Sequence, residues 1–229
     1  MLKLIRVWLR MGILEGGVTS PTGAGNPAGL TEFPLLANIA LHVLDEAWQH
    51  EGRRLGTLVR YCDDFVVLSP TRQRAEQGRE LAAKVPECLG MRLHPEKSGI
   101  VCLTKGGQGF EFLGFHHRKV ESWRCRGRYY LQRWPSARAM RVLRDKVRAA
   151  TACSKATRPV SAVVADLNPV LRGWGAYFHN GNSGRKFNAV GSYVHEQLAI
   201  LASRKHGLRA RNWTTRFTYG WITRLGSIA

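Results

Sequence analysis

The chain has 229 residues, 44% of them hydrophobic, which is enough for one large domain or two small ones with a real core. This composition excludes an intrinsically disordered chain, and no apolar run reaches the roughly 20 residues that a membrane-spanning helix needs. The net charge of +19 is unevenly divided: residues 1–115 hold 13 Lys+Arg and 12 Asp+Glu, and residues 116–229 hold 22 and 4. A nearly neutral half joined to a strongly basic half indicates a polyanion-binding domain attached to something else.

Helical spacing and loop-forming residues alternate in the first 50 residues. We expect a helix over residues 2–9, a loop rich in Gly and Pro over 15–31, and a longer helix over 33–48. One apolar face of the longer helix is formed by Leu36, Ile39, Val43 and Ala47, with Ala40 and Leu44 beside them. Asp45 and Glu46, near its end, are expected to be solvated.

Short β segments follow. Residues 58–62 and 65–68 predict two strands around a tight Asp63-Asp64 turn, because they are rich in β-branched and aromatic side chains. Ser69 and Pro70 are typical of a helix start, and that helix is expected to run to about Leu89. Further strands are predicted over residues 99–103, 110–115 and 128–133.

The second half predicts helices. Ser136 can cap a helix that runs to about Ala152 and buries Met140, Leu143, Val147 and Ala150. Later helices are expected over residues 160–166, 169–178 and 187–201. The expected fold is therefore α+β, with a mixed first part followed by an all-α part.

The cysteines number five, an odd count, and no two of them have C-x-x-C spacing. This pattern argues against a disulfide framework and against a zinc ribbon, and a reducing, cytoplasmic location fits it best. A metal site at His116, His117 and Cys125 is disfavoured because their spacing fits no standard zinc pattern.

The most informative tetrapeptide is Tyr61-Cys62-Asp63-Asp64, with apolar strand on both sides. Two adjacent carboxylates repel each other, and a divalent cation removes that repulsion. Their hard oxygen atoms suit Mg²⁺, and a pair of such ions about 4 Å apart can activate a primer hydroxyl and stabilise the leaving pyrophosphate. Aspartate is also a common turn residue, so by itself the tetrapeptide fits either interpretation.

Five segments in order resemble the reverse transcriptase/maturase proteins encoded by group II introns. Tyr61-Cys62-Asp63-Asp64 resembles that family's Y-A-D-D box. The other four are residues 34–42 (PLLANIALH), 93–98 (LHPEKS), 110–115 (FEFLGF) and 168–178 (NPVLRGWGAYF).

This resemblance implies a partial polymerase palm over residues 1–133, an antiparallel sheet with helices, and a helical thumb/maturase domain over 134–229. It implies an RNA-directed DNA polymerase ancestry that uses Mg²⁺, with Asp63 and Asp64 as metal ligands and catalytic residues. It further implies intron RNA binding and splicing assistance. By the same resemblance the nucleotide-binding residues would be Pro27, Gly29, Tyr61 and Lys97, although Lys97 also fits an ordinary surface lysine.

Two departures from the family pattern argue against polymerisation by this chain alone. The family's first catalytic Asp lies upstream of a stretch that resembles residues 2–9, so we expect the fingers and that Asp to be absent. The family's T-P-Q-G box is replaced by Asn26-Pro27-Ala28-Gly29, which loses the Gln, and Glu32 adds negative charge nearby. A complementing fragment that carries the fingers and the Asp could restore activity.

The basic half interleaves Arg and Lys with Trp and Tyr, a composition that suits structured or single-stranded RNA. Trp174, Tyr177 and Phe178 are at helical spacing and are expected in the core rather than on RNA. The expected RNA-binding residues are Arg138, Arg141, Arg144, Lys146, Arg148, Arg172, Arg204, Lys205, Arg209 and Arg211.

Three interpretations remain open on the sequence. The first is a truncated group II intron reverse transcriptase/maturase. The second is a non-catalytic RNA-binding splicing cofactor, and the third is an unrelated basic protein that binds nucleic acid, including DNA. Primer extension separates the first two, and preference for folded intron RNA over duplex DNA excludes the third.

Overall fold

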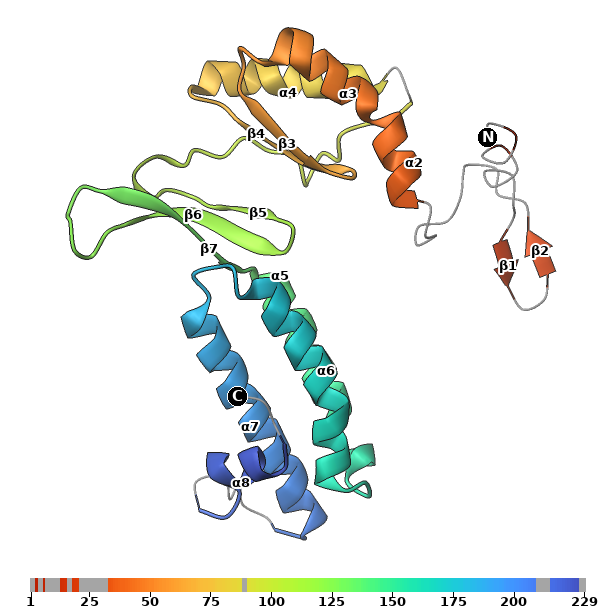
Figure 1. Ribbon diagram of the computed structural model, residues 1–229, viewed down its shortest axis with the longest axis vertical. Coiled ribbons are helices and arrows are strands. Elements are labelled where there is room, and N and C mark those ends of the chain that lie inside the picture. Colours follow the sequence, from red (N-terminus) through yellow and green to blue (C-terminus); the bar gives the residue numbers. More distant parts are fainter. Residues whose placement is uncertain are drawn as a thin grey trace. The chain divides into compact units, whose positions relative to one another are not determined.

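The computed structural model describes Lys3, Arg6 and residues 13–15, 18–20, 33–87, 90–208 and 215–226 (Figure 1). The chain divides into two compact units, Met1–Ile100 and Val101–Ala229. Both helices and small antiparallel sheets are present, which confirms the α+β fold class. In the described part of the chain, no helix has the length and apolar character needed to cross a membrane. Apart from Lys3 and Arg6, the helix expected over residues 2–9 lies outside the described residues.

The first described hairpin pairs strand β1 (Ile13–Glu15) with strand β2 (Val18–Ser20) in antiparallel register, Ile13 opposite Ser20. The loop expected over residues 15–31 is therefore wrong at β2. A three-residue strand is too short for an alternation of apolar and polar residues to be a strong signal. The Gly and Thr content of the surrounding segment therefore favoured a loop.

The helix expected over residues 33–48 is confirmed, but it is interrupted. Helix α2 (Phe33–Ala40) ends before Leu41, helix α3 (His42–Ala47) follows, and η1 (Trp48–Gly52) is a π-helical turn. The expected apolar face is wrong at Ile39 and Val43, which are exposed, whereas Leu44, expected beside that face, is buried together with Leu41 and Trp48. Leu41, with φ −83° and ψ 0°, interrupts the helix, so a face expected for one continuous helix does not persist.

The β3–β4 hairpin packs on helices to form the core of the first unit. Strand β3 (Thr57–Tyr61) and strand β4 (Asp64–Leu68) are antiparallel, and helix α4 (Arg72–Glu87) follows (Figure 1). The buried side chains of this core are Leu44, Trp48, Leu55 and Ala82. The predicted helix start at Ser69 and Pro70 is two residues early, because α4 begins at Arg72 and the Thr71 hydroxyl accepts a 3.3 Å hydrogen bond from the Arg74 amide.

A three-stranded antiparallel sheet begins the second unit. Its strands are β5 (Phe110–Phe112), β6 (Phe115–Glu121) and β7 (Tyr129–Pro135), in the order β5-β6-β7, after a short helix η2 (Thr104–Gly106). The single strand predicted over residues 110–115 is wrong, because Leu113 (φ 49°) and Gly114 (φ 75°) form a tight turn between β5 and β6. The strand predicted over 99–103 is also wrong, since those residues carry no strand pairing.

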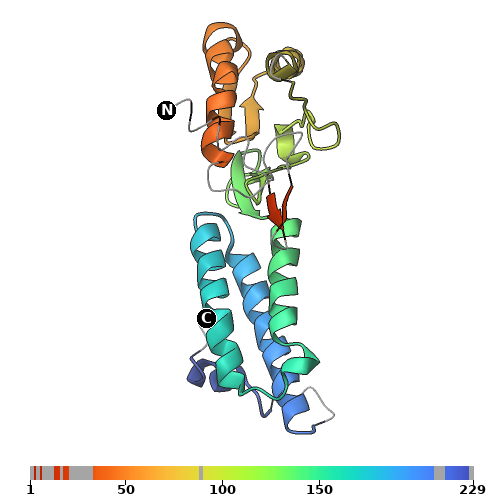
Figure 2. The same cartoon turned by 90° about the vertical axis from the view of Figure 1, so that its right-hand side faces the viewer.

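Three long helices form the core of the second unit, and they pack against one another, as Figure 2 shows. They are α5 (Ala137–Ala150), α6 (Val160–Phe178) and α7 (Gly184–Lys205), joined by η3 (Cys153–Lys155) and followed by α8 (Tyr219–Arg224). The Ser136 cap is confirmed, since its hydroxyl accepts a 3.2 Å hydrogen bond from the Ala139 amide. The two helices predicted over 160–166 and 169–178 form one, because α6 continues through Pro169.

The boundary between the compact units falls at Ile100, so the three-stranded sheet groups with the helices. The predicted functional boundary, a palm over residues 1–133 and a thumb/maturase domain over 134–229, stays a prediction. It falls within β7, two residues before that strand ends at Pro135.

Candidate functional site

The acidic tetrapeptide lies at the end of the β3–β4 hairpin. Tyr61 pairs with Asp64, so the two-residue turn consists of Cys62 and Asp63 rather than of the two aspartates. Both Asp63 and Asp64 are exposed. Because directly opposed residues share a face of the sheet, Asp64 lies on the same face as the exposed Tyr61, away from the helix-packed side that includes Phe65.

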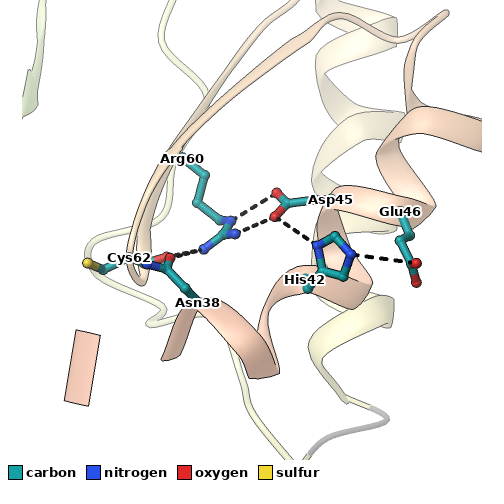
Figure 3. Close-up of polar contacts among 6 residues, drawn as sticks. All are labelled: Asn38, His42, Asp45, Glu46, Arg60 and Cys62. Carbon is teal, nitrogen blue, oxygen red and sulfur yellow. Dashed lines mark hydrogen bonds and ion pairs between the residues drawn. The ribbon is translucent and has the colours of Figure 1, made fainter. Parts of the chain in front are cut away.

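Cys62 has a φ of 52°, in the left-handed region that favours glycine. A residue with a side chain stays in that conformation only where its surroundings hold it there. Here the Arg60 guanidinium Nη1 donates a 2.8 Å hydrogen bond to the Cys62 carbonyl (Figure 3). The turn that carries Asp63 is therefore held by a side chain from its own strand.

Arg60 also ties the hairpin to the helices before it. Its Nε donates a 2.9 Å hydrogen bond to Asp45 Oδ1, its Nη2 donates to Asp45 Oδ2, and its Nη1 donates to Asn38 Oδ1 at 2.8 Å (Figure 3). The Arg60 side chain is only 12% exposed. The hydrogen bond with Asp45 raises the pKa of Arg60, against the lowering effect of burial, so the guanidinium is charged throughout.

The expectation that Asp45 is a solvated residue is wrong. Its carboxylate is 28% exposed and is bound by both ends of the Arg60 fork. Glu46 is exposed as expected, and its Oε1 lies 3.6 Å from His42 Nε2. The sequence gives no local signal for the Arg60–Asp45 pair, because its members are 15 residues apart on a strand and a helix.

The hairpin places two carboxylates next to each other at its turn. Asp63 and Asp64 supply adjacent carboxylate oxygens, the donors that Mg²⁺ prefers. Among the described residues no three His, Cys, Asp or Glu side chains gather to hold a metal ion. Since Mg²⁺ takes about six oxygen ligands, the pair fits the ion chemically but leaves most of its coordination to other donors.

The expected nucleotide-binding residues are only partly described. Tyr61 is 63% exposed on the open face of the hairpin, beside Asp64. Lys97 is exposed in a turn whose Lys97 and Ser98 amides donate to the His94 carbonyl at 3.2 and 3.0 Å. Pro27 and Gly29 lie outside the described residues, so their nucleotide-binding role stays a prediction.

Helix α5 separates basic from apolar side chains. Met140, Leu143 and Val147 are buried, as expected, in the core of the second unit. The five basic side chains expected to bind RNA on this helix are all exposed: Arg138, Arg141, Arg144, Lys146 and Arg148. Two of them have partners within the chain, since Arg144 lies over the Tyr193 ring at 5.6 Å and Arg148 Nη1 lies 3.2 Å from Asp145 Oδ1.

The remaining expected RNA-binding residues are dispersed. Arg172 is exposed on α6, and Arg204 and Lys205 are exposed at the end of α7. Lys205 Nζ donates a 2.9 Å hydrogen bond to the Arg158 carbonyl. Arg209 and Arg211 lie outside the described residues.

The aromatic residues near the sheet have structural contacts. Phe178 is buried and Trp174 packs against the core, as expected, but Tyr177 is exposed and donates a 2.9 Å hydrogen bond to the Leu113 carbonyl. His117 stacks on Phe110 with ring centroids 5.0 Å apart. Burial lowers the pKa of His117, and the charge of Arg133 lowers it further.

Comparison with known proteins gives two family matches. Residues 2–117 match the family described as reverse transcriptase (RNA-dependent DNA polymerase), and residues 140–219 match the group II intron maturase-specific domain. A search of curated proteins found no match. The first match spans half of the chain, and the order of the two matches is the order of the motifs, which sets aside the interpretation as an unrelated basic protein. The chain therefore belongs to the reverse transcriptase family, as a group II intron reverse transcriptase/maturase.

Proposed function

We propose that the chain binds folded group II intron RNA through its basic helical half and assists splicing. The observation that carries this proposal is the arrangement of α5, where Met140, Leu143 and Val147 are in the core and the basic residues face solvent. Residues 116–229 hold 22 Lys+Arg and 4 Asp+Glu, so few acids within this half compete for the exposed cations.

The salt dependence of binding tests this proposal. Each Lys or Arg that neutralises a phosphate adds about 0.7–0.9 to the slope of log K against log salt. Arg138, Arg141 and Lys146 are the residues to change to Ala, because Arg144 packs over Tyr193 and Arg148 pairs with Asp145. The triple variant is expected to bind a folded intron RNA more weakly and with a slope smaller by about 2.

The matched control is a double variant on α4 of the other unit, Arg74→Ala with Arg79→Ala, two exposed arginines outside the basic half. This control is expected to keep the wild-type slope. Equal slopes for the α5 and α4 variants would contradict the role of α5. Equal affinity for folded intron RNA and duplex DNA of the same length would contradict RNA selectivity.

Asp63 and Asp64 are proposed as the catalytic carboxylates and as two ligands of a Mg²⁺ site inherited from the polymerase. The ion, when bound, would activate the primer hydroxyl and stabilise the charge on the leaving pyrophosphate. The chain's own part is to hold the two carboxylates, and Arg60 supports this by fixing the Cys62 carbonyl. Tyr61, Lys97, Pro27 and Gly29 are proposed to contact the nucleotide.

Polymerisation by this chain alone is not part of the proposal. Two carboxylates leave most of the coordination sphere to other donors, and the sequence Asn26-Pro27-Ala28-Gly29 lacks the polar Gln of the family's nucleotide pocket. A complementing segment that supplies a further carboxylate fits the hairpin, whose open face carries the exposed Val59, Tyr61 and Leu68.

Primer extension on an RNA template with Mg²⁺ tests whether Asp63 and Asp64 still support DNA synthesis in this chain. The wild-type chain and the Asp63→Ala, Asp64→Ala double variant are both expected to give no extension, which favours action as a splicing cofactor. Extension by the wild type that the double variant abolishes would instead establish an active polymerase with an additional carboxylate.

A further inference from the structure

The loop that joins β6 to β7, residues 122–128, carries Trp123. This side chain is 81% exposed, more than any other large hydrophobic side chain that the structure describes. In Figure 1 the β6–β7 hairpin extends away from the three long helices of its unit, with this loop at its far end. We call residues 122–128 the Trp123 loop.

The Trp123 loop is closed by its own hydrogen bonds. The Ser122 amide donates to the Arg128 carbonyl at 2.7 Å, and the Arg128 amide donates to the Cys125 carbonyl at 3.2 Å. The Gly127 amide donates to the Glu121 carboxylate at 2.7 Å, and Gly127 has a φ of 82°. None of these contacts uses the indole, so the loop conformation does not depend on Trp123.

The surroundings of Trp123 are strongly basic. Residues 116–133 contain six Lys+Arg and a single acid, Glu121, whose carboxylate already accepts the Gly127 amide. The Arg124 guanidinium carbon lies 4.8 Å from the centroid of the Trp123 ring. This cation–π contact places a positive charge beside the indole while most of the side chain stays open to solvent.

Further aromatic surface continues down the hairpin. Tyr129 and Tyr130, which follow the loop on β7, are 38% and 40% exposed and lie on opposite faces of the strand. Aromatic rings interleaved with arginines are the combination by which proteins hold single-stranded nucleic acid, through base stacking and phosphate contacts. A protein partner would more often be matched by an apolar patch with its charges at the rim.

We propose that the Trp123 loop is a stacking site for an unpaired base of the bound RNA, with Trp123 as the platform and Arg124, Arg126 and Arg128 on the flanking phosphates. The proposal rests on the proposed RNA-binding function and adds a second contact region to α5. Unpaired bases in loops and bulges present a free ring face, whereas bases in a helix do not. The Trp123 loop therefore selects unpaired positions.

The test uses the full chain and two RNA stem-loops that differ in the position of one 2-aminopurine, in the loop or in the stem. Trp123→Leu is expected to weaken binding of the loop-labelled RNA by about 5- to 150-fold, the effect of removing one stacked base. It should also abolish the quenching of 2-aminopurine fluorescence that stacking on an aromatic ring produces. Trp123→Phe, which keeps a ring, should restore most of the quenching.

The control variant is Leu131→Ala on the same hairpin, where an exposed side chain without a ring is removed. It is expected to leave quenching and affinity at the wild-type level. Quenching that survives in Trp123→Leu, or equal losses in Trp123→Leu and Leu131→Ala, would overturn the stacking site and leave the loop as a protein-contact surface. If the wild type binds folded intron RNA in either case, the proposed function stands, and if it binds no RNA, both proposals fail.

Discussion

Arg60 and Asp45 form a two-pronged ion pair that joins strand β3 to helix α3, and the same guanidinium binds the carbonyl of Cys62 (Figure 3). The acidic turn and the helix are thus fixed by one side chain. A planar guanidinium with several N–H donors can make these contacts together, which a lysine ammonium cannot.

Replacing Arg60 by Ala is expected to loosen the acidic hairpin. The change removes the hydrogen bonds that the Arg60 guanidinium donates to the Asp45 carboxylate, at a cost of about 1.5–3 kcal/mol in local stability. Amide hydrogen exchange over residues 57–68 should become about 10- to 150-fold faster. Arg60→Lys should recover only part of the protection.

The comparison for Arg60 is Arg72→Ala, which breaks the exposed ion pair with Glu76. Exposed pairs contribute about 0–1 kcal/mol, so this variant should exchange nearly like the wild type over the same residues. Similar exchange in Arg60→Ala and Arg72→Ala would show that the guanidinium does not hold the hairpin.

Gly56→Ala is expected to destabilise the first unit by about 1–3 kcal/mol. Gly56 has a φ of 155°, and a Cβ there would lie 2.5 Å from the Leu68 carbonyl oxygen, so the backbone of β4 would have to move. Gly99→Ala is the control, because a Cβ at Gly99 meets no atom within 4 Å. The measurement is urea unfolding of both variants, and equal midpoints would contradict the clash.

Local sequence signals predicted the helices and strands of the chain better than they predicted which side of each element is buried. Ser136, with Met140, Leu143 and Val147 at helical spacing, correctly predicted α5, because a cap and one apolar stripe leave little choice. The face of the 33–48 helix was wrong at Ile39 and Val43, since the break at Leu41 depends on tertiary packing. The single strand predicted over residues 110–115 was wrong for a related reason. Leucine is not a typical residue for a positive φ, and the turn at Leu113 becomes evident only from the pairing of β5 with β6.

The candidate site was predictable only where its residues are adjacent in sequence. The Asp63–Asp64 pair stands out in the chain, but the position of the turn, one residue earlier than expected, depends on the cross-strand register. The Arg60–Asp45 pair could not be predicted, because no spacing rule connects a strand to a preceding helix. Trp123 was overlooked for the opposite reason: a tryptophan is usually buried, and only its surroundings in space reveal its exposure.

Stability of the second unit is expected to fall at mildly acidic pH through His117. Burial and Arg133 lower the pKa of His117 below its ordinary value of 6.5. The unfolded chain therefore takes up a proton at a pH where the folded chain does not, so stability is full above about pH 6.5 and declines as the pH falls toward the lowered pKa. Thermal unfolding between pH 5.5 and pH 7.5 measures this decline.

His117→Phe should reduce that pH dependence, because phenylalanine can keep the stacking on Phe110 and does not titrate. His179→Gln, at an exposed position of the same unit, serves as the comparison and should follow the wild-type pH profile. An unchanged pH profile in His117→Phe would assign the decline to other groups.

Metal binding at the acidic hairpin can be followed with Tb³⁺, a hard cation that favours carboxylate oxygens as Mg²⁺ does and whose luminescence is excited by a nearby tyrosine. Tyr61 is directly opposite Asp64 on the same face of the hairpin, so an ion bound by Asp64 lies close to that phenol. Asp63→Asn and Asp64→Asn should each weaken Tb³⁺ binding by at least about 10- to 100-fold. Loss of a residue that only supports a metal ligand has an effect of this size, and loss of a direct ligand should have no less. Tyr61→Leu should remove most of the luminescence. In the wild type, an excess of Mg²⁺ should displace Tb³⁺.

The control is Glu80→Gln, which removes an exposed carboxylate from α4 and should change neither the affinity for Tb³⁺ nor the luminescence. Equal weakening by Glu80→Gln and Asp64→Asn would mean that the ion binds acidic surface at large, and that the two aspartates form no metal site in this chain.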